Sequence, residues 1–125
     1  MYKFFNPNPN KGSNVGDCTI RAIALATEQS WDDVYIDLAV LGYSFKDMPS
    51  SNYVWSAYLR SRGFERFAIP NSCPDCYTVW EFCEDHPHGT YILATGTHVV
   101  TVVDGDYYDA WDSGHEVPIF YFEKR

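Results

Sequence analysis

The sequence is poor in basic residues and contains no long apolar run. Its 125 residues include 9 lysines and arginines against 17 aspartates and glutamates, a formal net charge of −8 at pH 7. A surface that follows nucleic-acid phosphates needs the opposite balance, so we expect no nucleic-acid partner. No apolar stretch approaches the ~18 residues of a membrane-spanning helix, and the opening residues lack the apolar core of a signal peptide. We therefore expect a cytoplasmic protein that is not bound to a membrane.

The chain contains only four cysteines. Because nothing indicates export, we expect reduced thiols. The segment from Cys73 to Cys76, with Cys83 and His86 downstream, contains enough soft ligands for a tetrahedral zinc ion. The ligand spacing is irregular, so we expect structural cysteines, no metal and no other cofactor. Zinc held by Cys73, Cys76, Cys83 and His86 is the weaker alternative.

The sequence does contain enough apolar material for one core. With 46% hydrophobic residues, residues 1–125 are expected to form a single domain in which 1–13 is an extended lead-in. Capping and stop signals predict helices over about 18–25, 31–41, 51–62 and 78–86. Strand-like runs at about 91–94, 97–103, 107–111 and 118–122 are separated by short turns. The expected class is α+β, with N-terminal helices packed on a C-terminal antiparallel sheet of about four strands.

Cys18 stands at the first turn of the first predicted helix. There the positive end of the helix dipole and unpaired N–H groups stabilise a thiolate. If a histidine reaches it, the pair becomes a nucleophile and its base. The alternative is that Cys18 is a small buried side chain with no chemical role.

His98 stands at the start of the most strand-like segment, His98 to Val103. In a strand it shares a face with Val100 and Val102, where an apolar residue would pack better. A polar side chain there needs a partner. His98 is therefore either the base for Cys18 or a core histidine that a backbone carbonyl satisfies.

The hairpin after His98 decides which acid can meet it. A two-residue turn at Asp104-Gly105 would bury Asp109 among valines, whereas a three-residue loop places Asp112 beside His98 at the end of an apolar face. We expect the three-residue loop, with Asp112 as the orienting acid and Asp109 as the fallback. Asp112 as an ordinary acid at a strand end is the alternative.

The order of these residues resembles that of the papain-like cysteine peptidase superfamily. Gly16-Asp17-Cys18 and His98-Val99-Val100 resemble motifs of its bacteriocin-processing peptidases, and the segment from Gly16 to Ala24 resembles one of the ovarian-tumour-type deubiquitinases. The chain as a whole is similar to small bacterial and phage proteins. The resemblance implies a papain-like fold and a Cys18-His98-Asp112 triad that hydrolyses a peptide or isopeptide bond. Transfer of the acyl group to an amine would use the same residues.

One feature of that superfamily is missing. Papain and the bacteriocin-processing peptidases carry a glutamine upstream of the cysteine as an oxyanion donor, and this chain has no glutamine before Cys18. Asn14, together with the backbone N–H of Cys18, is the candidate donor. Trp111 is the candidate for a substrate groove on a peptide or protein partner, and the oligomeric state is left open. The missing glutamine also leaves a second possibility, a catalytically silent papain-like protein that binds a host protein.

Overall fold

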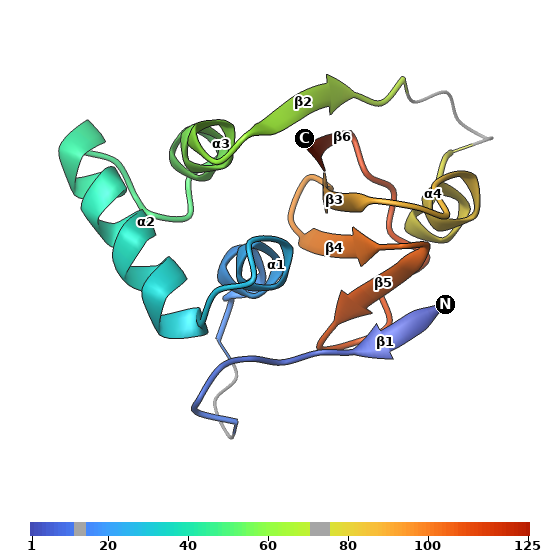
Figure 1. The fold of residues 1–125 in the computed structure, drawn as a ribbon, viewed down its shortest axis with the longest axis horizontal. Coiled ribbons are helices and arrows are strands. Elements are labelled where there is room, and N and C mark those ends of the chain that lie inside the picture. The colour runs from blue at the N-terminus through green and yellow to red at the C-terminus, as the bar shows by residue number, and fades with distance from the viewer. Residues whose placement is uncertain (12–14, 71–75) are drawn as a thin grey trace.

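Four helices and six strands follow one another in residues 1–11, 15–70 and 76–125, the parts of the chain that the computed structural model describes. The helices are α1 (Cys18–Ala26), α2 (Trp31–Phe45), α3 (Asn52–Ser61) and α4 (Val79–Asp85). The strands are β1 (Tyr2–Phe4), β2 (Phe64–Ala68), β3 (Thr90–Ala94), β4 (Val99–Val103), β5 (Asp106–Asp109) and β6 (Phe120–Lys124). The fold is therefore a mixture of helices and one sheet (Figure 1).

The helices begin where the capping signals predict. The side chains that accept a hydrogen bond from the first turn are Ser30, Ser51 and Thr78. Helix α2 differs at its other end, because it continues past Gly42, where we expected it to stop. A Cβ on Gly42 would lie 2.8 Å from the carbonyl oxygen of Asp47. This glycine therefore permits a close backbone approach and does not end the helix.

The sheet has six strands in the described residues, in the order β1-β5-β4-β3-β6-β2, so the expectation of about four strands is wrong. The four expected strands are its centre, and β1 and β2 are added at the two edges. β1 pairs with β5 in parallel, although we expected its residues to be part of an extended lead-in. Both edge strands are short and mostly exposed, so they lack the apolar alternation that marks a strand in a sequence.

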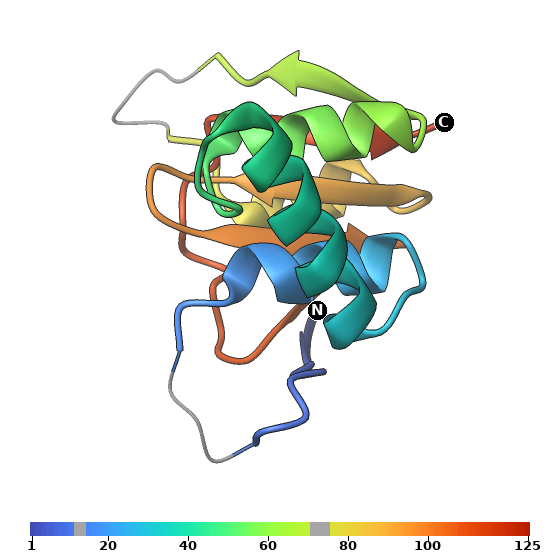
Figure 2. The ribbon, with the colours of Figure 1, turned by 90° about the vertical axis from the view of Figure 1, so that its left-hand side faces the viewer.

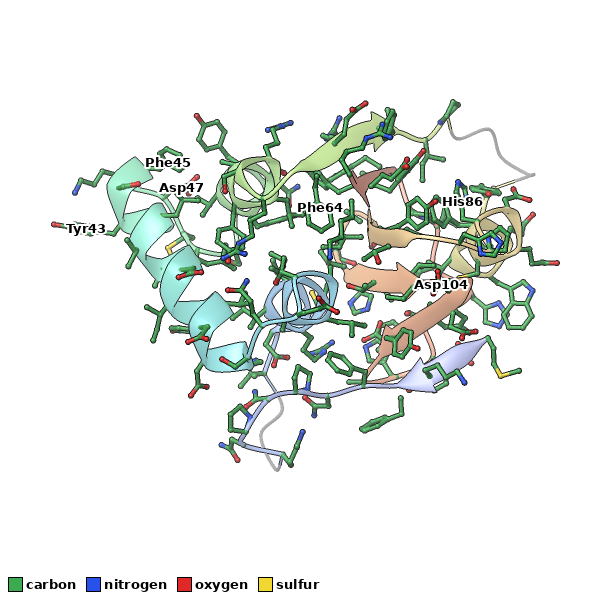
Figure 3. All side chains as sticks on the ribbon, in the orientation of Figure 1. Tyr43, Phe45, Asp47, Phe64, His86 and Asp104 are labelled. Atoms are coloured by element: carbon green, nitrogen blue, oxygen red, sulfur yellow. The ribbon has the colours of Figure 1, made fainter. Side chains whose placement is uncertain are left out.

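The helices cover the sheet unequally. Helices α1, α2 and α3 lie on one side and α4 on the other, as Figures 1 and 2 show. The larger core, which includes Trp55 and Phe64, lies under the three helices, and the smaller core packs α4 against β3, β4 and β5. Figure 3 labels Phe64 on the first side and His86 beside α4. Every helix in the described ranges is too short or too polar to cross a membrane.

Candidate active site

The side chains of Cys18 and His98 meet where α1 packs on β4. Cys18 is the first residue of α1, and His98 immediately precedes β4. The hydroxyl of Thr101 in β4 donates a hydrogen bond of 2.6 Å to the carbonyl oxygen of Ala22 in α1, which fixes the helix along the strand. Cys18 and His98 share a side-chain hydrogen bond. The structure therefore brings together the two residues that the sequence suggested as nucleophile and base.

The carboxylate beside His98 belongs to Asp109 and not to Asp112. Nε2 of His98 lies 2.6 Å from Oδ2 of Asp109, which is 3% exposed. This leaves Nδ1 of the ring for Cys18. Asp112 accepts hydrogen bonds from the Tyr107 hydroxyl and from the N–H of Gly114. Its expected position beside His98 is wrong.

The turn geometry explains this correction. Asp104 and Gly105 have φ values of 48° and 82°, as in the two-residue turns that suit a hairpin twist. Val103 accordingly pairs with Asp106, which is the register of a two-residue turn, and the three-residue loop is wrong. Continuing the register places Asp109 diagonally across from His98, within reach of a side-chain contact.

Asp109 can be buried because its charge is satisfied from outside the hairpin. Arg21 of α1 donates from Nη2 to its Oδ1 at 3.2 Å, and the Ser113 hydroxyl donates to its Oδ2 at 2.7 Å. The N–H of Ala110 donates to Oδ1 at 2.8 Å. Arg21 also forms an ion pair with Asp17, the residue before Cys18. Opposite charges therefore alternate from Asp17 through Arg21, Asp109 and the imidazolium to the thiolate.

The pKa shifts match this alternation. Burial lowers the pKa of His98, but its hydrogen bonds to Asp109 and Cys18 outweigh burial and raise the pKa to about 9. Burial would raise the pKa of Asp109, yet the bonds from His98 and Ser113 hold it below its ordinary value. Burial likewise opposes ionisation of Cys18, and the bonds from His98 and the Val99 N–H lower its pKa. Both the raised pKa of His98 and the lowered pKa of Cys18 favour a thiolate beside an imidazolium.

A cavity of about 250 Å³ opens beside Cys18 and His98. The Trp111 ring forms one wall, 4.7 Å from the His98 ring and 47% exposed, so it lies at the site as expected. Asn6 and Asn8 also line this cavity. The candidate oxyanion donor Asn14 lies outside the described residues.

The other cysteines have different environments. Cys83 is a free, buried thiol whose pKa burial raises to about 11. Cys76 is disulfide-bonded, so the expectation of a reduced thiol is wrong there, and Cys73 lies outside the described residues. His86 stacks on Phe82 at 3.8 Å. In the described ranges, no three His, Cys, Asp or Glu side chains are grouped to hold a metal.

Three residues of the site, Arg21, Ser113 and Asn8, were not predicted from the sequence. Arg21 carries the clearest signal, since it is a charged residue in an otherwise apolar helix, one turn after Cys18. Asn8 is 6% exposed and donates to Asp17 Oδ2 at 3.1 Å, so the lead-in contributes to the site. The fold and site define a mixed α/β domain in which a half-buried Cys18 lies beside a buried His98 and Asp109. Comparison of the chain with protein-family models, curated proteins and solved structures finds no match.

Proposed function

We propose that the protein is a cysteine hydrolase of the papain-like type, acting on a peptide or isopeptide bond in a peptide or protein. The observation that carries this proposal is the hydrogen-bonded series Cys18, His98 and Asp109. A cysteine that only fills space needs no histidine whose pKa is raised to about 9. The proposal includes a cytoplasmic location, in a bacterium or in the host of a phage, and requires no cofactor.

In the proposed reaction, the Cys18 thiolate attacks the carbonyl carbon and the carbonyl oxygen takes the negative charge. The protonated His98 gives its proton to the leaving nitrogen, the C–N bond breaks and a thioester remains on Cys18. His98 then takes a proton from water, the hydroxide attacks the thioester, and Cys18 leaves as a thiolate. Asp109 keeps the ring oriented and stabilises its positive charge. An amine in place of water would give acyl transfer.

The oxyanion needs hydrogen-bond donors in place of the missing glutamine. The first N–H groups of a helix have no carbonyl partner inside it, and that of Cys18 is the nearest to the nucleophile. Asn6 lines the same cavity and carries a side-chain amide. Its Oδ1 accepts from the Asn8 N–H at 3.2 Å, which fixes the amide plane. We infer that Asn6 is the second donor, as an alternative to Asn14.

Acylation by an activated ester tests the proposal without knowledge of the natural substrate. N-acetylglycine 4-nitrophenyl ester should release 4-nitrophenolate in a burst and leave the acyl group on Cys18, detected as a mass increase on one peptide. The burst should disappear in Cys18→Ser and in His98→Gln. Cys83→Ser is the matched control and should keep it. Added glycinamide then separates hydrolysis from transfer, since a transferase would release N-acetylglycyl-glycinamide.

One observation favours the second function, a catalytically silent protein that binds a partner. Ile36, Val40 and Tyr43 lie on one side of α2 at helical spacing and are 58%, 64% and 74% exposed. A binding protein would need such a surface but would not need a reactive Cys18. If Cys18 acylates no faster than a free thiol and its reactivity appears only above about pH 8, the hydrolase is refuted and the binding function is the proposal that remains.

A further inference from the structure

A second cavity, of about 330 Å³, lies between α1 and α2, beside the candidate site. This volume falls within the ~300–1,000 Å³ of typical ligand sites. The wall is mainly apolar, and its larger side chains are Val15, Ile20, Trp31, Tyr35, Leu38 and Pro49. It therefore has the size and lining of a site for an apolar group.

The two cavities share part of their lining. Val15, Gly16 and Asp17 belong to both, and they directly precede Cys18. A molecule whose carbonyl lies at Cys18 can therefore extend into the apolar cavity around this short segment. This segment therefore lies between the second cavity and the cavity that contains Cys18.

The charge in the shared wall is already neutralised. Arg21 bonds Oδ1 of Asp17, while Asn8 and the Trp31 indole donate to Oδ2 at 3.1 and 2.9 Å. A cationic side chain would therefore find no free carboxylate at Asp17. The Trp31 ring stacks on the Tyr35 ring at 5.3 Å, which presents an aromatic surface instead.

We propose that this cavity binds an apolar side chain of the substrate, aliphatic or aromatic, close to the bond that Cys18 attacks. This assignment rests on the proposed hydrolase function and adds a substrate class to it: peptides or proteins with a bulky apolar residue near the scissile bond. The Trp31 and Tyr35 rings and the Leu38 side chain are the specificity-determining contacts.

N-substituted iodoacetamides test the cavity, because each reagent places a chosen substituent near Cys18. The substituent can turn toward either side of the reacting carbon. The reagents are N-benzyl, N-cyclohexylmethyl and N-(2-hydroxyethyl) iodoacetamide. Each alkylation rate of Cys18 at pH 6 is divided by the rate of the same reagent with glutathione. We expect the two apolar reagents to exceed the hydroxyethyl reagent by about tenfold or more, as apolar pockets discriminate.

Two charge-matched variants on α2 locate the effect. Tyr35, which is 49% exposed, lines the cavity, so Tyr35→Asp should remove most of the preference. Tyr43 is 74% exposed and projects from the outer side of α2 (Figure 3), so Tyr43→Asp should keep it. The rate with unsubstituted iodoacetamide is measured for each variant, and the preference of each variant is expressed relative to that rate, so that a change in Cys18 itself is not counted as a change in the cavity.

The outcomes separate this inference from the function on which it rests. Equal normalised rates for all reagents, with a Cys18 that still reacts at pH 6, would refute the apolar cavity and leave the hydrolase standing. Loss of the preference in Tyr43→Asp as well as in Tyr35→Asp would also refute it. A Cys18 that fails to react with any iodoacetamide at pH 6 would refute the hydrolase and the inference together.

Discussion

Exchange of Asp109 for asparagine removes the negative charge between His98 and Arg21 while keeping the size of the side chain. An asparagine oxygen can still accept from Ser113 or Ala110, so local packing is retained. The charge that raises the pKa of His98 is lost, and burial then acts on the imidazolium with less opposition. The expected result is a less stable imidazolium and, with it, a less stable Cys18 thiolate.

The size of the effect follows from the pKa of His98. Burial pulls this pKa down, and the hydrogen bond that His98 donates to Asp109 contributes more than the one to Cys18 to its rise from 6.5 to about 9. Losing the larger part of that rise changes the protonation equilibrium of His98 by more than tenfold. A tenfold change corresponds to about 1.4 kcal/mol. Alkylation of Cys18 by iodoacetamide at pH 6 should therefore fall by about tenfold or more. Arg21 also loses a buried partner, so the free energy of unfolding should fall by roughly 3–5 kcal/mol.

The assay compares Asp109→Asn with Asp112→Asn, the same chemical change at the neighbouring acid. Alkylation rates are measured from pH 5 to 9, and urea unfolding at pH 7 confirms that each variant is folded. Asp112 faces solvent and bonds Tyr107 and Gly114, so its exchange should leave the alkylation profile unchanged. A loss of reactivity in Asp112→Asn with none in Asp109→Asn would contradict the observed hairpin register. If neither exchange matters while His98→Ala does, the site is a Cys-His dyad.

The remaining predictions concern the same site. Cys18 should be alkylated by iodoacetamide at pH 6 far faster than Cys83, whose pKa is raised to about 11, and His98→Ala should abolish the difference, as peptide mass spectrometry can measure. The raised pKa of His98 stabilises the fold fully below its unfolded value of 6.5, and this stability is lost as pH rises through about 9. The urea midpoint should therefore fall between pH 6.5 and 9.5, and it should fall less in His98→Gln. Asn6→Ala should slow acylation by about 10²-fold or more if Asn6 donates to the oxyanion, with the alkylation rate unchanged. Elemental analysis should find less than one zinc per chain, with the fold unchanged in excess chelator; one bound zinc per chain would contradict the expectation that the cysteines and histidines hold no metal.

The helices could be predicted because their signals are local. Ser30, Ser51 and Thr78 each precede a run with helical periodicity, and each accepts the expected capping hydrogen bond. Asp17 is the exception, because it occupies the N-cap position of α1 without making a side-chain cap. Its carboxylate bonds Asn8, Arg21 and Trp31 instead. The position of a residue next to a helix does not show whether its side chain caps the helix or bonds to distant residues instead.

The edge strands and the hairpin register depend on contacts that are distant in the chain. Strand β1 forms because β5 offers a free edge, and Tyr2 pairs with Tyr107. The two-residue turn looked unfavourable because the neighbours of Asp109 within the hairpin are apolar. Its stabilising partner, Arg21, lies 88 positions earlier in the chain. Periodicity within a hairpin carries no information about such a partner.

A buried arginine nevertheless imposes a condition that the sequence could have suggested. Arg21 follows Asp17 by four residues on an otherwise apolar helix, so an ion pair between them is expected. The guanidinium has five N–H donors, and burying it is costly unless a planar group of acceptors meets them. The Asp17 carboxylate can accept from only some of these N–H groups. The remaining donors lie on the side of the sheet, so a second acid is favoured on the sheet. Asp109 lies inside the predicted strand 107–111 whereas Asp112 lies beyond its end, and only an acid in the strand faces a helix packed on the sheet. The requirement of Arg21 for a partner would therefore have favoured Asp109 and the two-residue turn, against the pattern of valines that pointed to Asp112.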